Sequence, residues 1–102
     1  MDFELATAEE VCKQLGQRLK QQRLSQNICQ ADLAARAGVS TGTIKNLERR
    51  GQCSLDTLAH IVMALGLGRD LEALFQLKVH SIAQMEQAAT AVRPRASRRK
   101  RA

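Results

Sequence analysis

The chain has 102 residues and a net charge of +6, with 44% hydrophobic and 25% charged residues. This length holds one small domain and excludes a two-domain enzyme. Phe3 and Phe75 are the only aromatic residues, so the core must be aliphatic. No window approaches the length of an apolar membrane span, and the acidic first residues are unlike the basic start of a signal peptide. We therefore expect a soluble, cytoplasmic protein with no membrane partner.

Residue types that carry catalysis or bind metals form no recognisable set. Cys12, Cys29 and Cys53 are widely spaced and contain no C-x-x-C pair, which predicts neither a disulfide framework nor a zinc site. The two histidines have no ligand at metal spacing, and no Ser/His/Asp set or phosphate-binding glycine loop is present. We expect no enzyme, metal or cofactor. Cys53 precedes a predicted helix cap, where the pKa of a thiol can fall, so a redox-sensing role stays open.

The positive charge is concentrated in two blocks. Residues 13–50 carry eight bases against two acids, and residues 91–102 carry six bases and no acid. Clustered cations gain by releasing the counterions condensed on a polyanion. The pattern favours a nucleic-acid partner over a charge that serves solubility alone.

The first predicted helix begins near residue 8, because Thr7 and Glu10 have the spacing of a capping box. An apolar residue then recurs at every fourth position, at Val11, Leu15 and Leu19. The next position of this stripe is Arg23, whose charge is costly to bury without a carboxylate. The sequence should therefore supply an inward-facing acid elsewhere.

A second helix is predicted from about Gln30 to Arg36, with Gly38 as its left-handed stop. A three-residue turn leads to a third helix that Ser40 caps. Its apolar pattern turns Glu48 inward, as the carboxylate that Arg23 requires. The outward face carries no acid and consists of Gly42, Lys45, Asn46 and Arg49.

A fourth helix is predicted after the cap Ser54, and glycines should end it. Its expected apolar face is Leu55, Leu58, Ile61, Val62 and Leu65, and its stop is Gly66 with Gly68. Asp70 is expected to begin a fifth helix that carries Leu71, Leu74 and Phe75. Apolar and polar residues then alternate over 75–79, which predicts a short dimerisation strand that pairs with a second copy; a frayed end of the fifth helix is the alternative. A weak helix over 81–91 and a disordered tail over 93–102 complete the chain.

Two helices joined by a glycine-containing turn, the second with a basic outer stripe, predict a helix-turn-helix at residues 30–49. An ordinary helical hairpin would not require that stripe to be free of acids. The motif residues resemble the phage lambda repressor and Cro-like helix-turn-helix family over about residues 10–76. The resemblance is carried by Leu15-Gly16, Arg18-Leu19, Arg23, Gln30-Ala31-Asp32-Leu33-Ala34, Ala37-Gly38-Val39-Ser40, Ile44 and Leu47-Glu48.

This resemblance implies an all-α, compact five-helix DNA-binding domain that acts as a homodimer on a double-stranded DNA operator. It also implies a buried ion pair between Arg23 and Glu48, and a backbone phosphate at Gln30. Within the family the chain is most similar to HipB-type antitoxins, small repressors that bind a HipA-like kinase toxin. Cys29 departs from the usual capping Ser or Thr, and Thr41-Gly42-Thr43 replaces the usual Gln or Arg readers, so no base preference carries over.

The sequence thus predicts a DNA-binding domain at 1–76, a dimerisation or partner extension at 77–90 and a basic tail at 91–102. The expected base-reading residues are Thr41, Gly42, Thr43, Lys45 and Asn46. Phosphate contacts are expected from Gln30, Arg49 and Arg50. Lys45 could reach a phosphate instead of a base. The tail is expected to bind DNA, a protein or only solvent. Its cations are Arg93, Arg95, Arg98, Arg99, Lys100 and Arg101.

The function that follows, with the resemblance, is an autoregulating repressor that acts as a homodimer and as the HipB-type antitoxin of a HipA-like kinase toxin. A phage-type repressor without a toxin partner and a protein that mainly neutralises a toxin are the alternatives. RNA binding is disfavoured, because readers of single strands use aromatic stacking platforms and this chain has two aromatic residues.

Overall fold

The computed structural model describes residues 1–78, and every regular element in that part of the chain is helical. A 3-10 helix, η1 (Phe3–Leu5), precedes five α-helices: α1 (Ala8–Ser25), α2 (Gln30–Ala37), α3 (Thr41–Arg50), α4 (Leu55–Ala64) and α5 (Gly68–Glu72). Residues 1–72 form one compact unit, and Ala73 begins a second. The prediction of an all-α, five-helix fold is confirmed.

The predicted caps set the helix boundaries. Thr7 and Glu10 form the reciprocal capping box at the start of α1, with nitrogen–oxygen distances of 3.0 and 3.1 Å. The Ser40 hydroxyl accepts a hydrogen bond from the Thr43 N–H at the start of α3. Gly38 ends α2 with a φ of 74°, the left-handed conformation that favours glycine. The turn between α2 and α3 is therefore short and fixed at both ends.

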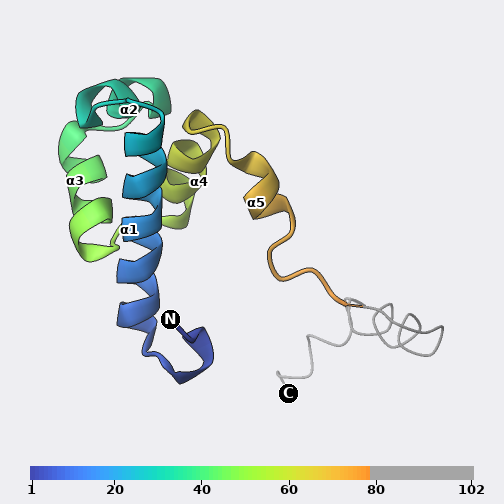
Figure 1. Ribbon diagram of the computed structural model, residues 1–102. Coiled ribbons are helices and arrows are strands. Elements are labelled where there is room, and N and C mark those ends of the chain that lie inside the picture. Colours follow the sequence, from blue (N-terminus) through green and yellow to red (C-terminus); the bar gives the residue numbers. More distant parts are fainter. Residues whose placement is uncertain (79–102) are drawn as a thin grey trace, which may run out of the picture. The chain divides into compact units, whose positions relative to one another are not determined.

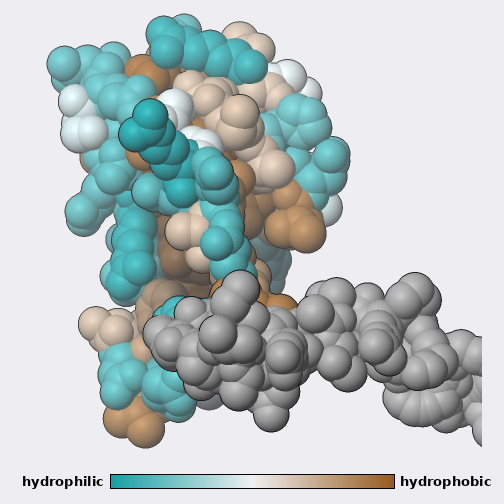
Figure 2. Space-filling view, turned by 90° about the vertical axis from the view of Figure 1, so that its right-hand side faces the viewer, coloured by the Kyte–Doolittle hydropathy of each residue, from teal (hydrophilic) through white to brown (hydrophobic). Residues whose placement is uncertain are grey.

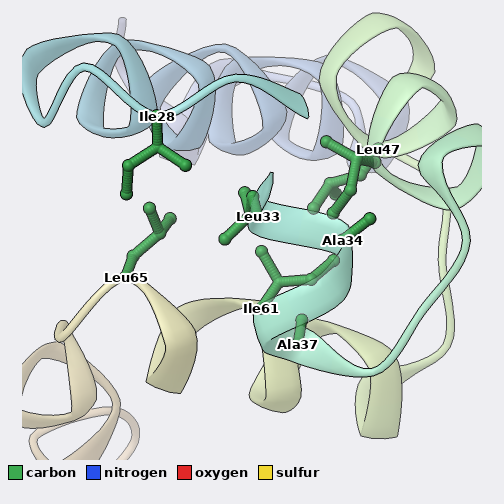
Figure 3. Packing of buried hydrophobic residues seen from close by; sticks show 8 residues of the cluster. Ile28, Leu33, Ala34, Ala37, Leu47, Ile61 and Leu65 are labelled. Carbon is green, nitrogen blue, oxygen red and sulfur yellow. The ribbon is translucent and has the colours of Figure 1, made fainter. Parts of the chain in front are cut away.

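The core is aliphatic, as the composition requires. In Figure 1, α2 lies at the C-terminal end of α1, and α3 and α4 lie on opposite sides of α1. Figure 3 shows the α2 side chains Leu33, Ala34 and Ala37 in one cluster with Leu47 of α3, Ile61 and Leu65 of α4 and the segment after it, and Ile28. Because α2 packs against both of these helices, it fixes the position of α3 in the unit.

The crossing of α1 and α3 depends on a glycine. A Cβ built at Gly16 would overlap the carbonyl oxygen of Leu47, so the two backbones are in direct contact. The buried residues of α1 are Gly16 and Arg23, with Leu19 half-buried between them. Leu15, which the period of four placed in the core, is 38% exposed. A strict period of four drifts about 40° per step around a helix of 3.6 residues per turn, which carries Leu15 off the buried face.

Arg23 and Glu48 form the expected ion pair, and only 5% and 4% of their surfaces are exposed. Arg23 Nε donates to Glu48 Oε2 at 2.7 Å, and Arg23 Nη2 donates to Glu48 Oε1 at 3.0 Å. The remaining guanidinium nitrogen, Nη1, donates to the carbonyl oxygen of Ile28 at 2.8 Å. The pair thus connects α1, the segment before α2, and α3.

The environment of this pair favours its charged form. Burial by itself would raise the pKa of Glu48, but hydrogen bonds from Arg23 and Gln30, and the charges of Arg23 and Lys20, hold that pKa below its usual range. The hydrogen bonds that Arg23 donates to the Glu48 carboxylate in turn raise the pKa of Arg23.

Three details of the C-terminal half differ from the sequence prediction. Leu55 is 80% exposed, because it lies one turn before Leu58, the first α4 residue that packs against the core. The left-handed stop after α4 is Gly66 alone, with a φ of 76°. Gly68 is the first residue of α5, so this helix begins before Asp70.

Figure 2 shows apolar residues at the surface among hydrophilic ones.

The predicted strand is not formed within the part of the chain that the structure describes. Helix α5 ends at Glu72, so Leu74 and Phe75 lie beyond it. Phe75 has a φ of 57° and is 95% exposed, and this left-handed residue interrupts both an extended strand and a continued helix. Val79, the weak helix over 81–91 and the basic tail lie outside the described residues. Dimerisation through this segment stays a prediction.

Gly16→Ala should destabilise the fold by about 1–3 kcal/mol, because the added methyl group must push α1 away from α3. Urea unfolding measures the effect. Gly42→Ala is the matched control, since a Cβ at Gly42 would meet only the Ser40 hydroxyl oxygen, at 3.8 Å. Equal stability of the two variants would contradict the close crossing.

Glu48→Ala should cost about 3–5 kcal/mol, because it leaves the buried Arg23 without its carboxylate. Folding lowers the pKa of Glu48. The contribution of this group is therefore fully present above the pKa of the unfolded chain, and it is lost as pH falls through the lower pKa of the folded protein. Urea unfolding as a function of pH measures both effects. Glu48→Gln should remove this part of the pH dependence, and a wild-type acid profile for Glu48→Gln would refute the assignment.

Candidate nucleic-acid interface

The two faces of α3 have opposite character. Its inner residues Ile44, Leu47 and Glu48 are buried, and Glu48, its only acid, is paired with Arg23. The exposed residues on the other side are Gly42, Lys45, Arg49 and Arg50, and the half-buried ones are Thr41, Thr43 and Asn46. Helix α3 is therefore held in the core by its inner face and presents a cationic surface on its outer face.

The first turn of α3 combines a small residue with a threonine whose hydroxyl is already bonded. The Thr43 hydroxyl lies 2.8 Å from the Ser40 hydroxyl, which leaves its methyl group for apolar contact. The side of α3 at Gly42 is open, and nothing in the described fold requires a glycine there. A missing side chain at this point lets a partner approach the backbone closely.

Asn46 makes a bond that the sequence did not indicate. Its Nδ2 donates to the carbonyl oxygen of Gln52 at 3.1 Å, which ties α3 to the segment that follows it. An amide group keeps one further N–H and its oxygen for other partners. The helical pattern predicts Asn46 on the fully outward face, whereas the structure places this half-buried residue at the margin of that face.

Gln30 also has a structural partner. Its Nε2 donates to Glu48 Oε1 at 3.0 Å, so the first residue of α2 is attached to the buried ion pair. The same nitrogen carries a second N–H that can donate elsewhere. Cys29, the residue that caps α2, accepts a hydrogen bond from the Asp32 N–H through its sulfur at 3.4 Å, so the thiol replaces the usual hydroxyl cap.

Arg49 and Arg50 lie in the last turn of α3, before Gly51 closes the helix with a φ of 70°. Cations at this end interact favourably with the helix dipole, so the charges do not strain the fold. The six tail cations lie outside the described residues, and their expected role stays a prediction.

A hollow of about 330 Å³ adjoins this surface. Its lining comes from three helices and consists of Gln17, Lys20, Gln30, Lys45, Glu48 and Arg49. Gln17 and Lys20 of α1 are not among the site residues that the sequence predicts. The available signal was their spacing of three residues on the helix that carries Arg23, which gives them one shared face.

The remaining polar candidates carry no comparable site. Burial and the neighbouring Cys12 raise the pKa of Cys53, contrary to the lowering considered from the sequence. His60 Nδ1 lies 2.8 Å from the Asp56 carbonyl oxygen on the surface of α4. Among residues 1–78, no three His, Cys, Asp or Glu side chains gather to hold a metal ion. None of the described helices is long and apolar enough to span a membrane.

Comparison with known proteins agrees with this geometry. A family model described as a helix-turn-helix domain matches residues 14–75, from within α1 to just beyond α5. No curated protein matches the chain. The matched region covers more than half of the sequence and contains the whole surface built around α3. The chain belongs to the helix-turn-helix domain family of the Cro/C1/XRE type, and its family identifies it as a DNA-binding regulator.

Proposed function

We propose that this protein is a sequence-specific transcriptional repressor that binds double-stranded DNA as a cytoplasmic homodimer and regulates its own operon. The observation that carries this function is the surface of α3. Its Lys45 and Arg49 are exposed, while its one carboxylate is buried against Arg23. A rigid helix whose exposed face carries no acid fits the major groove, where phosphates line both edges.

In this proposal the N-terminal end of α3 enters the groove and reads bases. Gly42 allows close approach of the backbone, and the methyl groups of Thr41 and Thr43 contact thymine methyl groups. Asn46 bonds the N6 and N7 positions of an adenine while its second N–H keeps the contact with Gln52. Lys45 contacts a guanine edge or a phosphate.

Phosphate contacts position the helix. Arg49 and Arg50 lie where α3 leaves the groove, and Gln30 lies at the start of α2, whose free N–H groups favour an anion. One bidentate base contact supplies roughly 1–3 kcal/mol of discrimination, so one copy is a modest reader. A dimer that makes this contact in both half-sites doubles the free energy of discrimination. We therefore propose half-sites whose centres are about 34–36 Å apart or a multiple of that distance.

The resemblance to HipB-type antitoxins extends the proposal to a protein partner, a HipA-like kinase toxin encoded beside this chain. Co-expression with the neighbouring reading frame tests it, because a kinase that co-purifies and loses activity in the complex supports the antitoxin role. A neighbouring reading frame that encodes a phage protein would instead favour a phage-type repressor. A complex that inhibits the kinase without binding DNA would favour toxin neutralisation as the main role.

Selection of bound sites from a random duplex library tests DNA recognition directly. We expect an enriched palindromic site whose binding weakens with salt. Failure to bind any duplex at moderate ionic strength would refute the proposed function.

Asn46→Ala should relax the preference at one base pair in each half-site, because it removes one bidentate contact. Arg49→Ala should weaken binding to all duplexes alike, because a phosphate contact carries no base information. Competition binding with the selected site and with random duplexes measures both. Equal losses on specific and random DNA for both variants would contradict the two roles.

Gly42→Ala should weaken DNA binding without lowering the stability of the fold. The free protein has room for the methyl group, whereas a groove pressed against the backbone does not. Wild-type affinity in this variant would show that the first turn of α3 does not approach the DNA closely.

A further inference from the structure

The hollow beside α3 is built from parts of the chain that are far apart in sequence. Gln17 and Lys20 come from α1, Gln30 begins α2, and Lys45 and Arg49 come from α3. Figure 1 shows α1 and α3 side by side, and their contact at Gly16 fixes the distance between the two helices. The hollow is therefore a fixed part of the fold.

Its charge is strongly positive. Lys20, Lys45 and Arg49 line it, and its one carboxylate, Glu48, is already neutralised by two hydrogen bonds from Arg23. Lys20 and Glu48 line the same hollow, and the charge of Lys20 contributes to the lowered pKa of Glu48.

The three cations have no counter-charge bonded to them. Within residues 1–78, none of Lys20, Lys45 and Arg49 forms an ion pair or a hydrogen bond with another side chain. The lining also contains the amides of Gln17 and Gln30, and Gln30 uses one N–H for Glu48 and keeps a second. A small anion that only accepts hydrogen bonds matches this set of donors.

We propose that this hollow binds a backbone phosphate of duplex DNA, and that Lys20 and Gln17 thereby make α1 part of the DNA interface. The inference rests on the proposed function and adds to it a contact from a helix outside the helix-turn-helix motif. It also assigns Lys45 to a phosphate rather than to a guanine edge, because Lys45 lines the hollow together with Arg49.

The position of the hollow explains why a phosphate fits better here than a base edge. Lys45 and Arg49 belong both to the hollow and to the exposed face of α3, so the phosphate lies beside the helix that enters the groove. Glu48, which is paired with Arg23, and Gln30 form the adjoining part of the hollow's wall. A phosphate held there aligns α3 against the backbone through the network that fixes α3 against α1.

The test measures the salt dependence of binding to a labelled random-sequence duplex. Lys20→Met removes the charge and keeps most of the aliphatic stem, Lys20→Arg keeps the charge, and Arg36→Met is the matched control. Arg36 is an exposed cation on α2 that lines a separate hollow with α4. Melting midpoints confirm that each variant is folded.

Lys20→Met should reduce the slope of log K against log salt by about 0.9 per bound chain, which is the value for one neutralised phosphate. The ratio of the affinity at 50 mM salt to that at 200 mM salt should be roughly three- to fourfold smaller for Lys20→Met than for the wild type. The loss at low salt should be the same on every sequence. Lys20→Arg and Arg36→Met should keep the wild-type slope.

Two results overturn the inference while leaving the proposed function intact. One is a wild-type slope in Lys20→Met, and the other is an equal reduction in Lys20→Met and Arg36→Met, which would show an effect of net charge alone. A wild-type protein that binds no duplex overturns both proposals. A Lys20→Met slope reduced beside an unchanged Arg36→Met slope supports the hollow.

Discussion

The structure depends above all on the ion pair between Arg23 and Glu48. Both groups are buried, so their attraction must offset a desolvation cost of several kcal/mol for each ion. The geometry meets this need, because the pair is bidentate and both Ile28 and Gln30 add hydrogen bonds. A buried pair of this kind adds little net stability compared with apolar residues, but removing one partner is costly. Its main effect here is to set one alignment of α1, α2 and α3.

That alignment separates the supporting side of α3 from its exposed side. Ile44 and Leu47 hold the helix in the core, and Gly16 lets α1 approach it closely. The only carboxylate of α3 is used inside the fold, so the surface keeps cations alone. One residue, Glu48, thus both holds α3 in place and leaves no negative charge on the surface proposed to contact DNA.

Several polar residues at the edge of this surface have structural partners. Gln30 bonds to Glu48, Asn46 bonds to the Gln52 carbonyl, and the Thr43 hydroxyl lies against Ser40. These bonds restrict the side chains before any partner arrives. A group that is already oriented loses less conformational entropy on binding than a free one. The interface proposed for this protein is therefore preorganised by the same contacts that hold the helices together.

The sequence by itself determined helices α1 to α4, their N-caps, the left-handed turn at Gly38 and the need of Arg23 for an acid, because these follow from local spacing and from the cost of burying a charge. Only the tertiary structure decided which apolar residues are buried. Leu15 and Leu55 matched the helical period, yet the crossing point of α3 and the extent of the core left them exposed. The hydrogen bond between Asn46 and Gln52 and the hollow at Lys20 could not be predicted from the sequence either. Both depend on how separate parts of the chain meet in the folded protein.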